Sequence, residues 1–410
     1  TPRQTTQWHF KTTTTTTKDA SFLLPTTTKR LSPTTTCVYS GFTDNQLKYF
    51  GENGCGVPVV GVGGLKLYDP DEQGRLAGSG TLQKRIAQGS SYEYETVAEE
   101  EEGPWDAQDW LEDIGVPTNF ARNSAPVQAT VLGRTRLIGS DAPGDIQHVL
   151  MQLPEGMHYV EGQSISVIPP GTNAKTNKPH APRLYSIAST RYGDLLDGRT
   201  VGLCVRRAEY TDPITGIVDL SKAGVCSNFL CDAMPGQKVS VAGPVGKTML
   251  LPEDRNADII MVATGTGIAP FRGFLHRLFM ERTTHRHMFT GTAWLILGVP
   301  VSSGLLYKTE IDAMQQNALP GQLEVDYAIS REMTNSMDGG KLYVQHVLAE
   351  KADILLQRLE GGAHIYFCGL KGMMSGVFES LRQVCASRGM DFALKLKEWQ
   401  SKNQWHVEVY

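Results

Sequence analysis

The alternation of apolar and polar positions changes character along this chain of 410 residues. From about residue 124, short runs rich in β-branched residues are separated by Gly and Pro, a pattern typical of strands joined by turns. A helical pattern over residues 224–234 stands before the last of these runs. Six strands of this kind predict an antiparallel β-barrel. They cover residues 127–139, 146–153, 164–170, 184–190, 200–207 and 238–244.

After about residue 255, buried strand patterns alternate with longer helical patterns. This alternation predicts an α/β domain with a parallel, doubly wound (Rossmann-like) sheet. The expected strands are residues 258–264, 292–300, 323–330, 364–370 and 405–410. The expected helices are residues 270–282, 305–316, a helix from 343, and 376–389. We place the domain boundary near residues 251–258, with a barrel over 121–253 and the α/β domain over 254–410.

The amino-terminal end has a different composition. Residues 1–36 contain fifteen threonines, five Lys or Arg and one acid, Asp19. A hydroxyl-rich, basic and acid-poor segment predicts an organelle transit peptide, with a disordered low-complexity tail as the alternative.

Residues 37–120 form a Gly-rich and then acidic extension without long periodicity. Short apolar runs at 58–62 and 65–68 allow a small hairpin. The segment would serve either as an arm that docks on a membrane complex or as a spacer. The acidic run 99–102 predicts a solvated linker. Trp105 and Trp110 predict an amphipathic turn that packs on the main body.

Overall composition excludes several classes. The formal charge of −4 gives no reason to expect a nucleic-acid partner, and no run of eighteen apolar residues predicts a membrane span. The seven cysteines form no CxxC pair and no zinc spacing, so we expect free thiols in a reducing compartment and no metal site.

Two motifs about eighty residues apart suggest a dinucleotide lying across two domains. In RLYSIAS (183–189), strand alternation turns Arg183 and Tyr185 to one face, where a guanidinium suits phosphate and a ring can stack on a flat heterocycle. GTGIAPFRG (265–273) is a strand-to-helix turn of the kind that holds a pyrophosphate, although its GxGxxP pattern meets the dinucleotide fingerprint only in part. A plain strand–helix turn is the alternative.

A cationic cluster follows the expected strand 323–330. Ser330 and Arg331 end that strand, and Lys341, Tyr343 and Gln345 follow within fifteen residues. Arg331 and Lys341 suit a dianionic 2′-phosphate, and Tyr343 can stack on adenine. An NAD site would place an acid there instead, so the pattern favours NADP, with a solvated loop as the alternative.

As a set, these motifs resemble the plant-type ferredoxin–NADP reductases over roughly residues 120–410. The other strings that carry the resemblance are GVCSNFL (224–230), SRE (330–332), CGLKG (368–372) and the final VEVY. The resemblance implies an FAD-binding barrel followed by an NADP-binding domain. The enzyme would pass single electrons from reduced ferredoxin to FAD and a hydride on to NADP⁺ in photosynthetic electron transport.

Two other readings stay open at this point. The motifs do not decide the direction of electron flow, so NADPH could reduce ferredoxin in a non-photosynthetic plastid. A non-catalytic, flavin-bearing docking subunit is the other alternative.

The resemblance also implies catalytic residues: Ser186, Cys368, Glu408 and Tyr410. Cys368 would lie beside the nicotinamide and help align it. Ser186 and Glu408 would hydrogen-bond near the reacting atoms and relay a proton. Tyr410 would cover the flavin ring until the nicotinamide displaces it. Without the resemblance, the sequence predicts that Cys368 is a buried thiol and that Glu408 is a surface carboxylate. The alternating pattern before Tyr410 predicts that this last residue is held rather than frayed.

The remaining expected contacts belong to the cofactors. Gly224 and Ser227 match the family's loop for the FAD pyrophosphate, Tyr210 the tyrosine that stacks on adenine, and Arg206 a lysine directed at an NADP phosphate. The full set of expected cofactor-binding residues is Arg183, Leu184, Tyr185, Ser186, Cys204, Val205, Arg206, Tyr210, Gly224, Val225, Cys226, Ser227, Thr266, Gly267, Pro270, Ser330, Arg331, Lys341, Tyr343, Gln345, Gly369, Leu370 and Tyr410.

A basic stretch precedes the first motif. Lys175, Lys178, His180 and Arg183 could steer an acidic partner such as ferredoxin, or a flavodoxin in its place, and a solvated loop is the alternative. We expect a monomer in the chloroplast stroma. Peripheral attachment to a thylakoid complex is an open addition.

Overall fold

The computed structural model describes residues 59–61, 64–66, 111–173, 176–212, 215–281 and 283–410. The expected transit peptide, the acidic run, both tryptophans of the expected turn and Lys175 lie outside the described residues. The small hairpin expected in the extension is present: β1 (Val59–Gly61) pairs antiparallel with β2 (Gly64–Lys66).

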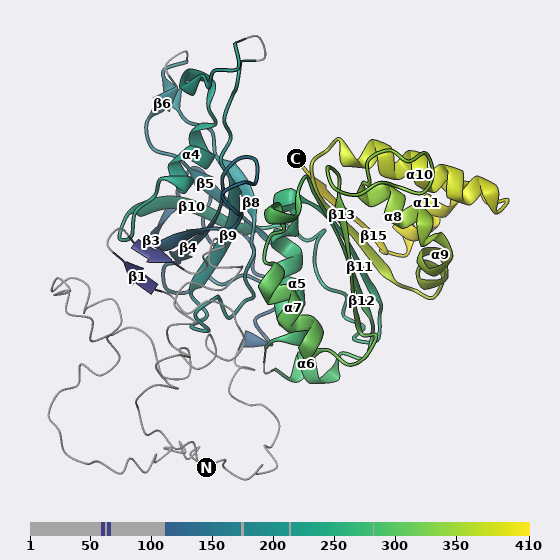
Figure 1. The fold of residues 1–410 in the computed structure, drawn as a ribbon. Coiled ribbons are helices and arrows are strands. Elements are labelled where there is room, and N and C mark those ends of the chain that lie inside the picture. Colours follow the sequence, from purple (N-terminus) through teal and green to yellow (C-terminus); the bar gives the residue numbers. More distant parts are fainter. Residues whose placement is uncertain (1–58, 62–63, 67–110, 174–175, 213–214, 282) are drawn as a thin grey trace, which may run out of the picture. The chain divides into compact units, whose positions relative to one another are not determined.

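The first large sheet is the expected antiparallel barrel. Its strands are β3 (Val127–Arg136), β4 (Ile146–Gln152), β5 (Ser164–Ile168), β8 (Arg183–Ser186), β9 (Thr200–Arg206) and β10 (Lys238–Val245). They follow the order β8–β5–β10–β3–β4–β9, and every neighbouring pair is antiparallel. A bridge between Ile187 and Leu203 joins the two outer strands and closes the sheet (Figure 1).

The barrel core is built from the inward residues of these strands together with the short helix α4 (Val225–Cys231). Cys226, Leu230 and Cys231 of α4 are buried against it. A small hairpin, β6 (Thr172–Asn173) with β7 (Lys178–Pro179), carries the basic stretch. The segment from Leu111 to Phe120 also packs on this domain: Leu111 is buried, and the Asn119 amide donates to the Pro244 carbonyl at 2.9 Å.

The second large sheet is parallel throughout, with the order β13–β12–β11–β14–β15. Successive residues of β11 alternate between two separate apolar clusters, as expected for a sheet that is covered on both faces. Helices α5 and α7 cover one face, and α8, α9, α10 and α11 cover the other (Figure 1). The strands are β11 (Ile259–Thr264), β12 (Ala293–Val299), β13 (Leu323–Ile329), β14 (His364–Gly369) and β15 (Trp405–Val409).

The helices of this domain follow the expected pattern with some differences. They are α5 (Ala269–Phe279), α6 (Thr284–Met288), α7 (Lys308–Asn317), α8 (Val344–Glu350), α9 (Ala352–Glu360), α10 (Met373–Ser387) and α11 (Phe392–Ser401). Short 3₁₀ turns lie at Leu220–Lys222, Gly265–Ile268 and Ser302–Gly304. None of the helices in the described part of the chain has the length and apolar character that a bilayer span requires.

Most element boundaries differ from the expectation by a few residues; two differences are informative, and two helices were not expected. The strand expected over 184–190 ends at Ser186, where pairing with β5 stops. Beyond it, Ile187 bridges to Leu203, and the Ala188 amide donates to the Gly202 carbonyl of β9 at 2.8 Å. The helix expected from Tyr343 has that residue as its N-cap and breaks at Lys351 into α8 and α9. The unexpected helices are α6 and α11.

Candidate functional site

The carboxyl ends of β11 and β14 approach each other more closely than any side chain would allow. A Cβ on Gly267 would lie 2.1 Å from the Cys368 carbonyl oxygen. Gly369 has φ +138°, and a Cβ there would lie 2.2 Å from the Thr264 hydroxyl oxygen. Glycine is therefore required at both positions. The start of the GTGIAPFRG turn is pressed against Cys368 and Gly369.

Cys368 is a fully buried thiol that interacts with the Ser186 hydroxyl. Burial, and then the charge of Glu408, raises the pKa of Cys368 to about 12, although the contact with Ser186 lowers it. The group is a neutral thiol at ordinary pH and cannot serve as a thiolate nucleophile. Since Ser186 lies on β8, this contact also joins the α/β domain to the barrel.

Glu408 makes a second contact between the same domains. The Ser164 hydroxyl donates to Glu408 Oε1 at 2.9 Å. Burial raises the pKa of Glu408, and the bond from Ser164 opposes this without cancelling it. Ser164 is buried and lies opposite Ser186 in the β5–β8 pair. Ser164 was not among the expected site residues. The sequence offered only one signal for it, a polar residue within a strand pattern.

Tyr410 is held, as its sequence context predicted. Its amide donates to the Gly369 carbonyl at 3.0 Å, and its carbonyl accepts from the Lys371 amide at 2.9 Å. The phenol oxygen is 2.5 Å from the Thr266 hydroxyl. The ring is 59% exposed, so a flat ligand ring could lie against it.

The expected flavin-binding residues gather around β8 and the start of α4. The Cys226 thiol donates to the Val167 carbonyl at 3.8 Å and also interacts with Tyr185, and the charge of Arg183 acts on both groups. Leu184 and Val225 are exposed apolar side chains at these two elements. Arg183 is exposed and donates only to carbonyl oxygens of its own loop in the described structure.

The loop before α4 is fixed by contacts with the end of β9. The Ala208 amide donates to the Ser227 hydroxyl at 3.1 Å, and the Gly224 amide donates to the Ala208 carbonyl at 2.8 Å. A Cβ on Gly224 would lie 2.6 Å from that of Ala208, so this approach also needs glycine. The ring of Tyr210 lies beneath the Lys222 ammonium at 4.4 Å.

Three expected residues on β9 divide into two kinds. The side chains of Cys204 and Val205 are buried in the interior, so they cannot present side-chain groups to a ligand. Arg206, at the end of the strand, is exposed. Pro270 stands in the first turn of α5, as expected, and is buried.

The expected 2′-phosphate cluster is assembled by one loop. Ser330 and Arg331 follow β13, where their amides donate to the carbonyls of Val299 and Pro300. Lys341 bridges back to Thr334 across the loop. Arg331 and Lys341 are exposed, and neither side chain has a hydrogen bond or ion pair to any residue that the structure describes.

Two further residues complete this cluster. The ring of Tyr343, the N-cap of α8, is 44% exposed and lies 5.8 Å from that of His346. The Gln345 side chain lies against Gly376, where a Cβ would meet it at 3.0 Å. The loop therefore presents two cations and an aromatic face. Its two acids accept hydrogen bonds from other groups, Glu332 from Ser302, and Asp338 from Asn335 and Gly340.

These features fit both FAD and NADP. Exposed ring and apolar side chains at Leu184, Tyr210, Val225 and Tyr410 are surfaces on which flat heterocycles can pack. Arg183 and the first-turn amides of α4 suit one pyrophosphate, and the amides of the Gly265–Ile268 turn suit the other. The Arg331 and Lys341 pair suits a 2′-phosphate.

Known proteins are similar to this chain over most of its length. Residues 261–379 match the family model described as the oxidoreductase NAD-binding domain. The chain is 51% identical over 296 residues to the chloroplastic ferredoxin–NADP reductase, root isozyme 1, of Arabidopsis thaliana, which covers 72% of this chain and 78% of that protein. It is 49% identical over 302 residues to the chloroplastic ferredoxin–NADP reductase of Chlamydomonas reinhardtii, covering 73% and 84%.

A leaf isozyme and a solved structure are also similar to this chain. Identity to the chloroplastic leaf isozyme 1 of Oryza sativa subsp. indica is 48% over 299 residues, covering 73% of this chain and 80% of that protein. The ferredoxin–NADP⁺ reductase of Plasmodium falciparum has the same fold, with a TM-score of 0.56 at 24% identity. It covers 71% of this chain and 99% of its own.

Proposed function

This chain belongs to the ferredoxin–NADP reductase family, and on that premise we propose that it catalyses electron transfer from reduced ferredoxin to NADP⁺. Two reduced ferredoxins, one NADP⁺ and one proton give two oxidised ferredoxins and NADPH. The observation that carries the proposal is the joint contact of Cys368 with Ser186 and of Glu408 with Ser164. It brings the ends of the α/β strands against the strands expected to hold the flavin.

FAD, when bound, accepts electrons singly and passes them on as a pair. The chain's own residues hold, align and protect the reactants. Arg183 and the amides at the start of α4 would bind FAD, with Tyr185 and Tyr210 against its rings. Arg331, Lys341 and Tyr343 would bind the adenosine end of NADP. Cys368, as a neutral thiol, would align the nicotinamide.

Glu408 and its hydroxyl partner would handle the proton. Burial raises the pKa of the Glu408 carboxyl, so the group holds a proton more tightly than an ordinary glutamate. Ser164 fixes the orientation of that carboxyl. Ser186, opposite Ser164, would face the reacting atoms, so the proton could pass along this pair of hydroxyls.

The direction toward NADP⁺ is our proposal, and the same residues serve the reverse flow, since the potentials of the partners set the equilibrium. Lys178, His180 and Arg183 lie at or near the barrel's small hairpin and would meet an acidic partner. We place the enzyme in the plastid, as a monomer in the stroma with peripheral attachment to a thylakoid complex.

The first test is a visible absorption spectrum of the purified protein, followed by anaerobic addition of NADPH and, separately, NADH. We expect an oxidised flavin spectrum that NADPH bleaches and NADH does not. Reduction of cytochrome c should then depend on added ferredoxin. A protein that stays colourless after incubation with FAD would overturn the proposal.

A variant of Cys368 separates an enzyme from a docking subunit. Loss of NADPH oxidation in Cys368→Ser, with FAD retained, supports catalysis. Unchanged oxidation would remove Cys368 from the reaction, whereas a docking subunit would show no NADPH oxidation in the unmutated protein.

A further inference from the structure

We propose that Arg272 is a positioning residue that ties the pyrophosphate-binding helix α5 to the barrel segment that follows the flavin-binding strand β8, and so sets how the two cofactors meet. The inference rests on the proposed function. Arg272 is the arginine of the GTGIAPFRG motif. The sequence patterns assigned no role to this arginine.

Arg272 points into the protein and is only 5% exposed. Its Nη1 donates to the Ala188 carbonyl at 2.8 Å and to Asp194 Oδ1 at 2.6 Å. Ala188 lies two residues after Ser186, the partner of Cys368. One nitrogen of α5 thus bonds the barrel directly behind the expected reaction centre.

The other side of the same guanidinium is fixed within the α/β domain. Nε and Nη2 donate to the two carboxylate oxygens of Glu310, on α7, at 2.7 and 3.3 Å. His276, one turn along α5, holds Glu310 at 2.9 Å. Burial and the charge of Arg272 lower the pKa of His276, so this ring is neutral and donates from Nε2 to the carboxylate.

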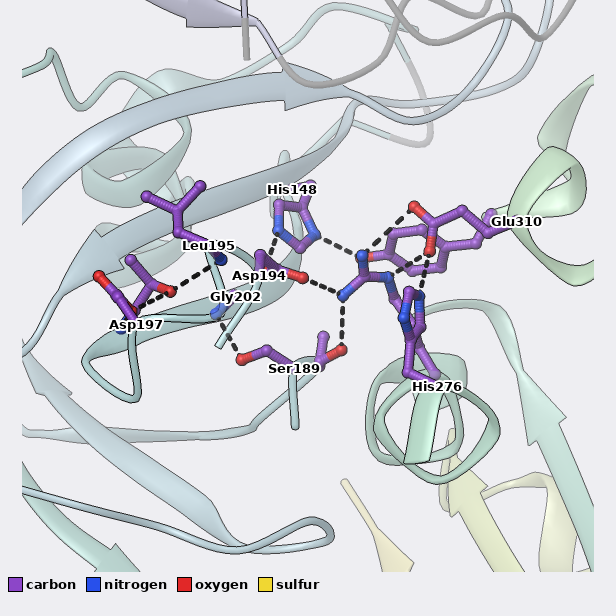
Figure 2. Close-up of polar contacts among 12 residues, drawn as sticks. His148, Ser189, Asp194, Leu195, Asp197, Gly202, His276 and Glu310 are labelled. Carbon is purple, nitrogen blue, oxygen red and sulfur yellow. Dashed lines mark hydrogen bonds and ion pairs between the residues drawn. The ribbon is translucent and has the colours of Figure 1, made fainter. Parts of the chain in front are cut away.

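The barrel side is braced in a similar way. His148 Nε2 lies 3.1 Å from Asp194 Oδ2, and His148 Nδ1 lies 2.9 Å from the Tyr307 hydroxyl. In Figure 2, Asp194 and His148 approach the network from one side, and Glu310 and His276 approach it from the other. The Tyr307 hydroxyl also interacts with Cys204, on β9, where burial raises the pKa of the thiol and this contact lowers it. The network therefore reaches two strands of the barrel.

The physical chemistry favours a role in geometry over one in stability. The carboxylates of Asp194 and Glu310 hold the guanidinium of Arg272 between them. The positive charge of Arg272 lowers the pKa of each carboxylate, so these groups stay charged at ordinary pH. Well-packed apolar residues in place of a buried ion pair are often equally stable, so such a pair is weak evidence of added stability. A planar fork with fixed donors does define position and angle.

Position matters because transfer between two bound rings needs reacting atoms about 3–3.5 Å apart, and a displacement of about 1 Å can cost on the order of a hundredfold in rate. Binding of each cofactor to its own domain does not need the network. The proposal therefore predicts a defect in transfer without a defect in either binding step.

The test compares Arg272→Lys and Asp194→Asn with the control Arg358→Lys. Arg358 pairs with Glu324 inside the α/β domain and touches neither the barrel nor the site in the described structure. Four quantities are measured on the full chain. They are bound FAD per protein, affinity for adenosine 2′,5′-bisphosphate, kcat and KM for NADPH with ferricyanide, and amide hydrogen exchange.

We expect Arg272→Lys to keep its FAD and its affinity for the bisphosphate, because each ligand binds within a single domain, FAD in the barrel and the bisphosphate in the α/β domain. Its kcat should fall at least about tenfold at saturating NADPH with little change in KM. Exchange should rise over residues 187–195 and 268–276. Asp194→Asn should show a smaller fall in kcat and a smaller rise in exchange, and Arg358→Lys should show neither change.

Unchanged kcat and exchange in both network variants would overturn the inference, as would equal losses in the control. If Arg272→Lys does not fold, Asp194→Asn decides by the same readouts. A failure of the proposed function is distinguishable, since the unmutated protein would then lack NADPH oxidation altogether while the exchange result still tests the coupling.

Discussion

Cys368 and Glu408 lie opposite each other in the parallel strands β14 and β15, and their side chains therefore share one face of the sheet. Ser186 and Ser164 lie opposite each other in the antiparallel strands β8 and β5 of the barrel. Cys368 interacts with Ser186, and Glu408 accepts a hydrogen bond from Ser164. The candidate reaction centre is thus one cross-strand pair from each domain, placed face to face.

Replacing Cys368 tests the proposal that this thiol aligns the nicotinamide and does not act as a nucleophile. Cys368→Ser keeps the shape but shortens the side chain and strengthens its dipole, so we expect kcat to fall about tenfold or more, ~1.4 kcal/mol of barrier, with FAD retained. The unmutated thiol should resist alkylation at pH 8, because burial raises its pKa to about 12. The control is Cys385→Ser, a buried thiol of α10. Rapid labelling of Cys368 in the folded protein would contradict this account.

Glu408 should affect stability in a defined direction. Because burial raises its pKa, the folded protein binds this proton more tightly than the unfolded chain does. The contribution to stability is present below the unfolded pKa of about 4.3 and is lost as pH rises through the folded pKa. The melting temperature of Glu408→Gln, relative to the unmutated protein, should therefore be higher at pH 7.5 than at pH 5. A difference that is constant with pH would show that Glu408 titrates normally.

Ser164 should tune the same carboxyl in catalysis. Its hydrogen bond lowers the pKa of Glu408, so Ser164→Ala should raise that pKa and move the alkaline fall in NADP⁺ reduction to higher pH. Ser166→Ala is the matched control, since Ser166 lies two positions along β5 and its buried hydroxyl has no partner in the described structure. Identical pH profiles for both variants would remove Ser164 from the proposed proton path.

Arg331 should carry much of the preference for NADPH over NADH. Its side chain is exposed beside Lys341 and unpaired among the described residues, so a 2′-phosphate would be its first charge partner. Arg331→Ala should lower the NADPH preference, as a ratio of kcat/KM values, by about 1–3 kcal/mol. Arg382→Ala, an exposed arginine on α10 paired with Glu379, should leave it unchanged. Equal kcat/KM for both nucleotides in the unmutated protein would refute the assignment.

Tyr410 should act as a displaceable cover. Its ring is held by the Thr266 hydroxyl and by strand pairing at its backbone, and a nicotinamide would have to break the side-chain contact. Tyr410→Ala should tighten NADP⁺ binding by more than about fivefold, because it removes the ring that covers the site as well as the hydrogen bond, which alone is worth roughly that factor. Tyr410→Phe should show a smaller gain. Weaker NADP⁺ binding in Tyr410→Ala would mean that the ring supports the nucleotide instead.

Local patterns predicted most of the fold for identifiable reasons. The β-branched runs of the barrel and the strand–helix alternation after residue 255 follow from burial on one or both sheet faces, and the described elements match them closely. The helix α11 was missed, although Asp391 caps it by accepting from the Ala393 and Leu394 amides. Its weak periodicity hid that signal. The break between α8 and α9 at Lys351 carried no sequence signal that we identified.

The sequence by itself determined which segments become strands and helices, and which motifs place glycines, cations and rings at their ends. These properties depend on neighbours a few positions away. Tertiary structure decided the pairings: Glu408 with Ser164 at 244 positions' separation, and Arg272 with Ala188 at 84. Such contacts depend on how two separately formed sheets pack together. The spacing of residues along the chain does not predict these pairs, because buried polar groups form hydrogen bonds with whichever groups lie opposite them once the two sheets have packed.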